Sequence, residues 1–470
     1  MRNHRTSPVV VATVIVVLVA ACANQPVPKP PSPSTPPALV PSASAEPPAP
    51  STSPAAGMIE QPVTPPGLDL APDSNRVDLA MPSFSNPTEI TNPLFPVSSQ
   101  ASVLMLGHVD DKPFRTEVTL LPYTRIVEWQ GQKVATAVSQ YVAYLDGKIQ
   151  EVAYDLYAQA DDGSVWYFGE DVFDFADGAI VTTEGTWQAG RDGPAAMIMP
   201  GDPQVGDVYR TENAPGLVFE QVTVQSVDEV LDGPLGPVQG GLVGRELHAD
   251  GATEDKQFAP GYGEFSTSDG ADLEALALAV PTDALGGPVP PDLAAITDGT
   301  RAIAAAVQAG DWAAATDASS GIRAAWDRFR SESTVPDSVA EWLGRDLDAL
   351  ATAIEAHETE ATQHAALDVR QSGLDLELRH RPVQDVDLDR FRLWLERLGL
   401  DVAADSAAAA RADVFALDYI RDRLRDRLDT ATAAAVNTQL GELQVAVVDN
   451  DREAMATAGS ELLATVAAVR

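Results

Sequence analysis

The feature that most constrains this fold is a change in sequence pattern near residue 286. From about residue 80 to 275, apolar and aromatic residues alternate with polar ones, and Asp-Gly pairs separate the runs. From residue 286 to 470, alanine is dense and apolar positions recur every three to four residues. A period of two is typical of strands, and the longer period is typical of helices. We therefore expect an α+β fold, with an antiparallel β-meander followed by an all-α helical bundle.

The Asp-Gly pairs mark the hairpins expected in residues 67–285. Asp146-Gly147, Asp162-Gly163 and Asp177-Gly178 each precede an apolar run, and the first pair also follows one. This dipeptide suits the left-handed dihedral angles of tight hairpin turns. The first part of the chain is therefore predicted to form an acidic antiparallel β domain.

A short internal repeat marks the helical part, residues 286–470. Residues 307–311 are echoed by residues 447–451. In each segment Gly310 or Asn450 can take the left-handed conformation that ends a helix, and Asp311 or Asp451 can cap the next helix. The two copies predict tight helical hairpins and suggest pseudo-symmetry in a bundle.

Residues 22–66 are expected to form a linker. Fifteen of the 44 residues from 23 to 66 are proline, mixed with Ser, Thr and Ala. Such a segment has too few large apolar groups for a core and favours polyproline II. Its expected role is to hold the body of the protein at a distance from its point of attachment.

Cys22 is the single cysteine of the chain. It follows a basic start with Arg2 and Arg5 and an apolar run of about 13 residues, 9–21. A membrane-spanning helix is the alternative, but it needs roughly 17–25 apolar residues. Val19-Ala20-Ala21-Cys22 resembles the lipobox of bacterial lipoproteins, which implies a signal peptide at residues 1–21 and acylation of Cys22. The location expected from this resemblance is extracytoplasmic, on the cell membrane.

The formal net charge of −38 limits the partners. A nucleic-acid backbone requires a basic surface, so nucleic acid is not expected as a partner. An anionic membrane surface would repel the chain, so its membrane contact is expected to depend on the lipid at Cys22. A single thiol also leaves no cysteine for redox, zinc-thiolate or nucleophilic chemistry in the body.

The end of the β part carries a second resemblance. Gly236-Pro237-Val238 precedes an expected strand near residues 242–248, and Phe258-Ala259-Pro260-Gly261-Tyr262-Gly263 follows a short turn. This pattern is similar to the ending of exported bacterial β-meander lipoproteins, with Phe258 where their pattern usually has Tyr. The resemblance implies a curved sheet or half-barrel like that of periplasmic lipoprotein carriers.

A long helix expected from Pro336 to about Arg381 carries the first candidate site. Leucine and isoleucine occupy the first positions of one helical stripe, and polar residues replace them further along. Imidazoles and carboxylates that converge inside a bundle can ligate iron, zinc or copper. The candidate metal ligands are His357, Glu360, His364 and Asp368.

His357-Glu358-Thr359-Glu360 also resembles the His-x-x-Glu element of imelysin-type, iron-regulated proteins, although the expected preceding glycine is missing. The structural alternative is that both histidines are hydrogen-bonded, for example to Asp418 or Tyr419, or face solvent. A transition metal is the one cofactor that this stripe suggests.

Aromatic residues of the β part form a further candidate site. Trp166, Phe168 and Tyr157 belong to an aromatic cluster that would line an apolar cleft on a concave sheet. Trp166 and Phe168 share one face of their strand, whereas Tyr167 faces the other way. The alternative is core packing against whatever covers the sheet.

The leading functional hypothesis is a non-enzymatic module that binds a small apolar ligand or an envelope protein. The second hypothesis is a metal-binding or metal-uptake accessory protein that uses the helical stripe. The third is an envelope hydrolase. The sequence lacks a Gly-x-Ser-x-Gly elbow, a phosphate-binding Gly-rich loop and a His-Glu-x-x-His motif, which argues against an enzyme without deciding the question.

Overall fold

The first part of the chain forms one antiparallel sheet. The computed structural model describes residues 58–59, 61–62, 67–269 and 272–469. Two short 3₁₀ turns, η1 (Asp73–Asn75) and η2 (Val97–Ser99), precede the first strand. The strands are β1 (Ser102–Val109), β2 (Lys112–Trp129), β3 (Gln132–Leu145), β4 (Lys148–Gln159), β5 (Val165–Ala176), β6 (Ala179–Thr182), β7 (Trp187–Gln188), β8 (Ala196–Met199), β9 (Val208–Ala214), β10 (Val218–Gly233), β11 (Gly236–His248), β12 (Thr253–Ala259), β13 (Gly263–Asp269) and β14 (Asp272–Val280).

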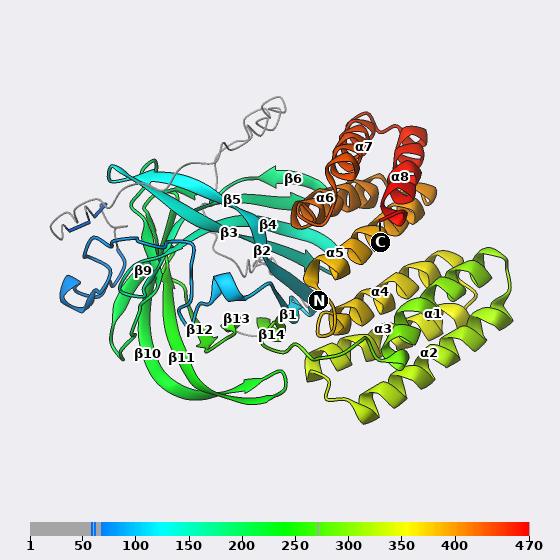
Figure 1. Cartoon of the computed structure of the whole chain (residues 1–470), viewed down its shortest axis with the longest axis horizontal. Helices are drawn as coiled ribbons and strands as arrows, with labels where there is room; N and C mark the ends of the chain where they lie inside the picture. The colour runs from blue at the N-terminus through cyan, green and yellow to red at the C-terminus, as the bar shows by residue number, and fades with distance from the viewer. Residues whose placement is uncertain (1–57, 60, 63–66, 270–271, 470) are drawn as a thin grey trace, which may run out of the picture.

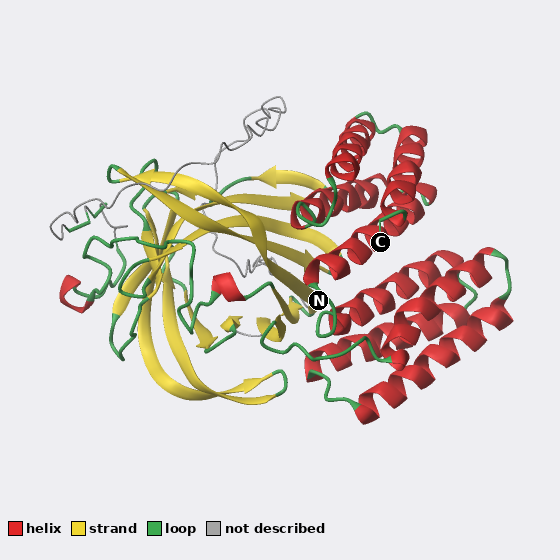
Figure 2. Cartoon of the chain, viewed as in Figure 1, coloured by secondary structure: helices red, strands yellow, loops and turns green. Residues whose placement is uncertain are grey.

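The sheet is a meander that is joined in its middle by the first and last strands. Its order is β6-β5-β4-β3-β2-β1-β14-β13-β12-β11-β10-β9, and β7 and β8 also pair with β5. The sheet curves strongly (Figure 2). β8, which pairs with β5 near one end of the strand order, also contacts β9, the strand at the other end. The expected antiparallel meander, followed by helices, is therefore confirmed.

Tight turns explain why these strands form hairpins. Asp146-Gly147 and Asp177-Gly178 have positive φ at both residues, the conformation of type I′ turns. Gln130-Gly131 makes the same turn between β2 and β3. At Asp162-Gly163, only the glycine has a positive φ.

The second part consists of helices joined as antiparallel hairpins (Figure 1). In the described residues the helices are α1 (Pro291–Gln308), α2 (Trp312–Glu332), α3 (Asp337–Glu355), α4 (Thr359–Glu377), α5 (Val383–Ala403), α6 (Ala407–Arg423), α7 (Thr430–Val448) and α8 (Arg452–Ala467). α1 packs against α2 and α4, and α5 packs against α6 and α8. The helices therefore form two successive four-helix bundles, α1–α4 and α5–α8.

The repeat seen in the sequence occurs four times in the structure. Gly310, His357, Asp405 and Asn450 each take a positive φ between the two helices of a hairpin. Asp311 and Asp451 accept hydrogen bonds from the backbone N–H groups of Ala314 and Ala454, as expected for N-caps. The capping prediction is confirmed, and the repeat extends to two turns that lack its sequence signature.

The prediction of one long helix from Pro336 to about Arg381 is wrong, because the structure has two helices there. The first helix begins near Pro336, but it ends at Glu355, and α4 begins at Thr359. His357 lies in the connecting turn with a φ of 57°. A left-handed residue reverses the chain direction, so α3 and α4 are antiparallel neighbours instead of one rod.

The helices cover the face of the sheet that lies opposite its concave interior. α6 contacts β2, β4 and β6, and α3 contacts β14. Buried ion pairs join the sheet to the helices: Arg423 of α6 lies 2.5 Å from Glu117 of β2, and Arg115 of β2 lies 2.6 Å from Asp375 of α4. Burial alone would raise the pKa of Glu117, but its arginine neighbours hold that pKa below its usual range.

The N-terminal features of the sequence lie mostly outside the described residues. Cys22, the expected signal peptide at residues 1–21 and most of residues 22–66 lie outside the described residues. Ile59 is an exception: its side chain is buried and its backbone N–H donates to the carbonyl of Leu79. None of the described helices is long and apolar enough to cross a membrane.

Candidate ligand-binding cavity

The pleat of the sheet creates the cavity, because every second residue of a strand points to the same face. One cross-strand row on the concave face runs through Leu120, Ser139, Asp155 and Glu170 on β2 to β5. The neighbouring row runs through Val103, Val118, Tyr141 and Ala153 on β1 to β4. An acidic row and an apolar row therefore lie side by side.

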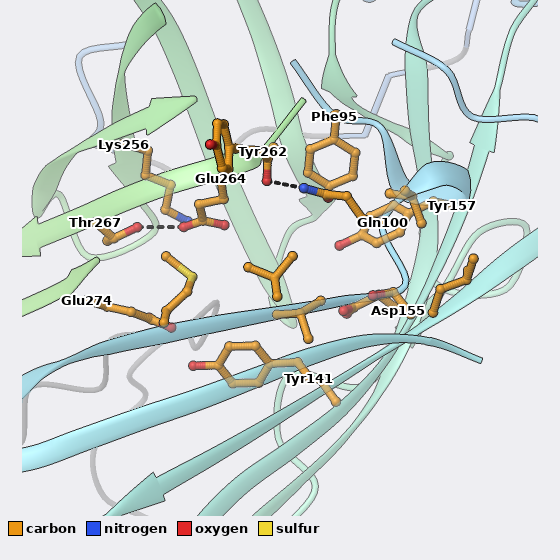
Figure 3. A pocket seen from close by; sticks show the side chains of 18 of the residues that line it. Phe95, Gln100, Tyr141, Asp155, Tyr157, Lys256, Tyr262, Glu264, Thr267 and Glu274 are labelled. Atoms are coloured by element: carbon orange, nitrogen blue, oxygen red, sulfur yellow. Dashed lines mark hydrogen bonds between the residues drawn. The ribbon is translucent and has the colours of Figure 1, made fainter. Parts of the chain in front are cut away.

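These rows enclose a cavity of about 130 Å³. β12, β13 and β14 form the opposite wall, and Phe95 and Gln100 cover it from the segment that precedes β1. Figure 3 shows Lys256, Glu264 and Glu274 at one end and Asp155 and Tyr157 at the other. The apolar lining residues are Phe95, Val97, Val103, Met105, Val118, Leu120, Tyr141, Ala153, Tyr157 and Tyr262.

Six carboxyl groups line this cavity, from Glu151, Asp155, Glu170, Glu254, Glu264 and Glu274. Burial, the largest cause, raises the pKa of Asp155 to about 7 and that of Glu274 to about 8. Burial, followed by repulsion from neighbouring carboxylates, raises the pKa of Glu151 well above its usual range. Burial and the Asp155 charge do the same to the pKa of Glu170. A buried carboxyl without a cation holds its proton.

Lys256 is the one basic residue among the described residues that line the cavity. Its Nζ lies 2.7 Å from Glu246 Oε2 and 3.6 Å from Glu254 Oε1. Burial opposes its charge, but Glu246, Glu264 and Glu254 raise its pKa well above the usual range. Lys256 therefore places one positive charge at its own end of the cavity, and none of the described residues that line the Asp155 end is basic.

A small group behind Lys256 has the composition of a metal site. Glu220, Glu246 and His248 bring one potential ligand atom each within 4.8 Å of one another, the single such group in the described part of the chain. His248 already contacts Glu220 at 3.0 Å, and hydrogen bonds with Glu220 and Glu254 raise its pKa to about 10 despite its burial. A histidinium and Lys256 supply the positive charge here, which disfavours a metal ion.

The structure does not bring the four helical metal candidates together. His357 is exposed and stacks on Trp312 of α2, with ring centroids 4.7 Å apart. His364 lies 3.4 Å from Asp401 of α5, and Asp368 pairs with Arg397. Glu360 is exposed at the start of α4. The predicted convergence fails because the turn at His357 interrupts the helical stripe; Asp401 is the carboxylate contact of His364, not Asp418 or Tyr419.

The three aromatic residues predicted to line a cleft lie on two different faces of the sheet. Tyr157 lines the cavity and stacks on Tyr167 at 4.9 Å. Trp166 and Phe168 pack against Trp129 on the opposite face, at 6.3 and 5.7 Å between ring centroids. These two residues are therefore core residues and not ligand contacts.

A bulge at Gly169 places Glu170 in the cavity. Trp166 and Phe168 face away from the cavity, so strict alternation would direct Glu170 away as well. Gly169 has a φ of 120°, and a Cβ there would lie 2.2 Å from the carbonyl oxygen of Trp187. Sequence reasoning did not place Glu170 beside an apolar cleft because it did not assign this bulge; the glycine inside an aromatic strand was the available signal.

No protein-family model matches the chain, and a search of curated proteins finds no significant match.

Proposed function

We propose that this protein is a non-enzymatic binding module whose β domain holds a small ligand in its interior cavity. The observation that carries the proposal is a cavity of about 130 Å³ whose lining combines an apolar row with carboxyl groups and one lysine. Small-molecule sites typically have this composition, because apolar contact supplies affinity and a few polar groups set orientation. A fully packed core would leave no such space.

The size of the cavity limits the ligand. A cavity of about 130 Å³ is comparable with the roughly 150 Å³ engineered cavities that bind benzene. The ligand is therefore a small molecule, about the size of one substituted aromatic ring.

A calorimetric screen of the purified full chain tests this function. The probes are small neutral, cationic and anionic aromatic compounds, and saturable binding of at least one class is expected. Ala153→Leu should abolish that binding because the added side chain fills the cavity, and Val118→Phe is a second filling variant. Ile126→Phe, at an exposed position of β2, is the matched control that should bind normally. Binding that survives both filling variants would place the ligand elsewhere, and a screen without any binding would refute the proposal.

We also propose that the module is anchored to the outside of the cell membrane through acylated Cys22. The support is the lipobox-like sequence, the single thiol and the long proline-rich segment that follows. Metabolic labelling with an alkyne fatty acid should label the full chain in a bacterial host, and Cys22→Ala should abolish both the label and membrane fractionation. Equal labelling of the variant would exclude acylation at Cys22.

A further inference from the structure

At the Asp155 end of the cavity, buried carboxyl groups have too few hydrogen-bond donors around them. Glu170 is 1% exposed, its carboxyl is hydrogen-bonded to that of another buried acid, Glu212, and no basic or amide group of the described residues donates to either of its oxygens. The nearby hydroxyl of Tyr167 donates to Asp155 at 2.8 Å. Buried polar groups are normally fully paired, so an acid in a cavity wall whose neighbour is a second acid indicates a missing donor.

A second buried acid shows the same deficit. Glu151 is 1% exposed, lines the cavity, and its Oε1 has no partner among the described residues. Glu151 and Asp155 lie on the same face of β4, and Asp155 is directly opposite Glu170 on β5. Asp155 and Glu170 therefore form one acidic patch on the cavity wall. Glu151 lies further along β4, beyond Ala153 of the apolar row, and Lys256 lies at the end of the cavity opposite Asp155.

The apolar row next to this patch specifies the other part of the ligand. Val118 and Leu120 are two residues apart on β2, so the apolar and acidic rows are separated by roughly 6.6 Å along the strands. This spacing suits a ring or short alkyl chain with a charged group one or two bonds away.

We propose that the ligand is a small organic ammonium ion, with its nitrogen between Asp155 and Glu170 and its apolar part against Val103 and Val118. This inference rests on the proposed function of the cavity. An ammonium group supplies both the positive charge and the several N–H donors that these carboxyl groups lack. A bare metal ion fits less well, because the acids of this patch do not converge on one point as the Glu220 group does.

A matched series of probes tests the inference: benzylamine, benzyl alcohol and benzoate, titrated calorimetrically into the purified full chain. The three probes share one ring and differ in charge. Benzylamine is expected to bind at least about tenfold more tightly than benzyl alcohol, and benzoate should not bind. Equal binding of the amine and the alcohol would refute the ammonium inference while leaving the cavity function intact. Failure of the amine and the alcohol together would refute the ammonium inference, and the cavity function would fall as well if the wider calorimetric screen also found no binding.

Variants separate the acidic patch from the overall charge of the protein. Glu170→Gln and Asp155→Asn should each weaken benzylamine binding about tenfold and leave benzyl alcohol binding unchanged. Glu229→Gln removes an exposed acid of β10 and is the matched control, with unchanged binding of both probes. If the control weakens amine binding as much as Glu170→Gln does, the effect is long-range attraction and the site is wrong. Using two patch variants covers the case in which one does not fold.

Discussion

Arg115 of β2 and Asp375 of α4 form a two-pronged ion pair between the sheet and the helices. Arg115 Nη1 lies 2.6 Å from Asp375 Oδ2, and Nη2 lies 2.8 Å from Oδ1. Asp375 also accepts a hydrogen bond from Arg390, so one carboxylate connects a strand with two helices. Parallel paired contacts of this type orient their partners as well as attracting them. This ion pair therefore orients α4 relative to β2.

Removing Asp375 should destabilise the protein strongly. Asp375→Ala leaves Arg115 and Arg390 buried without this partner, which typically costs about 3–5 kcal/mol. Asp348→Ala removes the partner of Arg323 at the surface and is the control, with an expected loss within about 1 kcal/mol. Urea unfolding of both variants measures the free energies of unfolding. Similar losses would mean that the buried pair does not hold the layers together.

The bulge at Gly169 should be needed for both stability and binding. Gly169→Ala places a Cβ against the Trp187 carbonyl at a positive φ, so a loss of about 1–3 kcal/mol is expected. Because the bulge directs Glu170 into the cavity, benzylamine binding should also weaken. Gly286→Ala, at a position with open space, is the control. A variant with full stability and full amine binding would contradict this role of the bulge.

Substitutions at the left-handed turns between helices should change the free energy of unfolding according to how readily the new residue adopts a positive φ. Gly310 has open space around it, so only its φ of 73° opposes a side chain. Gly310→Val should lower the free energy of unfolding by about 1–2 kcal/mol, and Gly310→Asn by less, because asparagine tolerates this region. Gly321→Ala, inside α2, should instead raise it by about 0.5–1 kcal/mol. Thermal unfolding should therefore rank the alanine variant above the asparagine variant and the valine variant last.

Stability should fall as the pH rises from about 5 to 8.5. Burial raises the pKa of Glu246 and Glu274 to about 8 from an ordinary value of 4.5, so the folded state keeps protons that the unfolded state releases. Unfolding then becomes easier with rising pH until the folded groups also ionise. His248, with a pKa of about 10 against an ordinary 6.5, acts in the same direction, because its stabilisation is complete below about pH 6.5 and declines above it.

Melting temperatures at pH 5.5, 7 and 8.5 test this dependence. The highest value is expected at pH 5.5, and Glu274→Gln should flatten the profile because its amide does not titrate. A melting temperature that rises steadily towards pH 8.5 would show that the interior acids are ionised in the folded protein.

Local chemistry made part of the fold predictable. The turns at Asp146-Gly147 and Asp177-Gly178, and the caps at Asp311 and Asp451, depend on neighbouring residues alone. The order of strands and helices follows from hydrophobic periodicity, which is equally local. Tyr157 was identified as a cavity residue because aromatic residues cluster around it in the sequence.

The sequence by itself thus determined the two kinds of secondary structure, their order and many of their turns. Only the tertiary structure decided which face of the sheet encloses the cavity, because helices bury the other face and alternation no longer separates inside from outside. It also decided the separation of His357 from His364, since one left-handed residue turned an expected helix into a hairpin. Asp155 and Glu170 lie on the consecutive strands β4 and β5, but only the bulge at Gly169 directs Glu170 to the face of Asp155. That bulge lies against the Trp187 carbonyl of β7, a contact that the local alternation of residues does not encode.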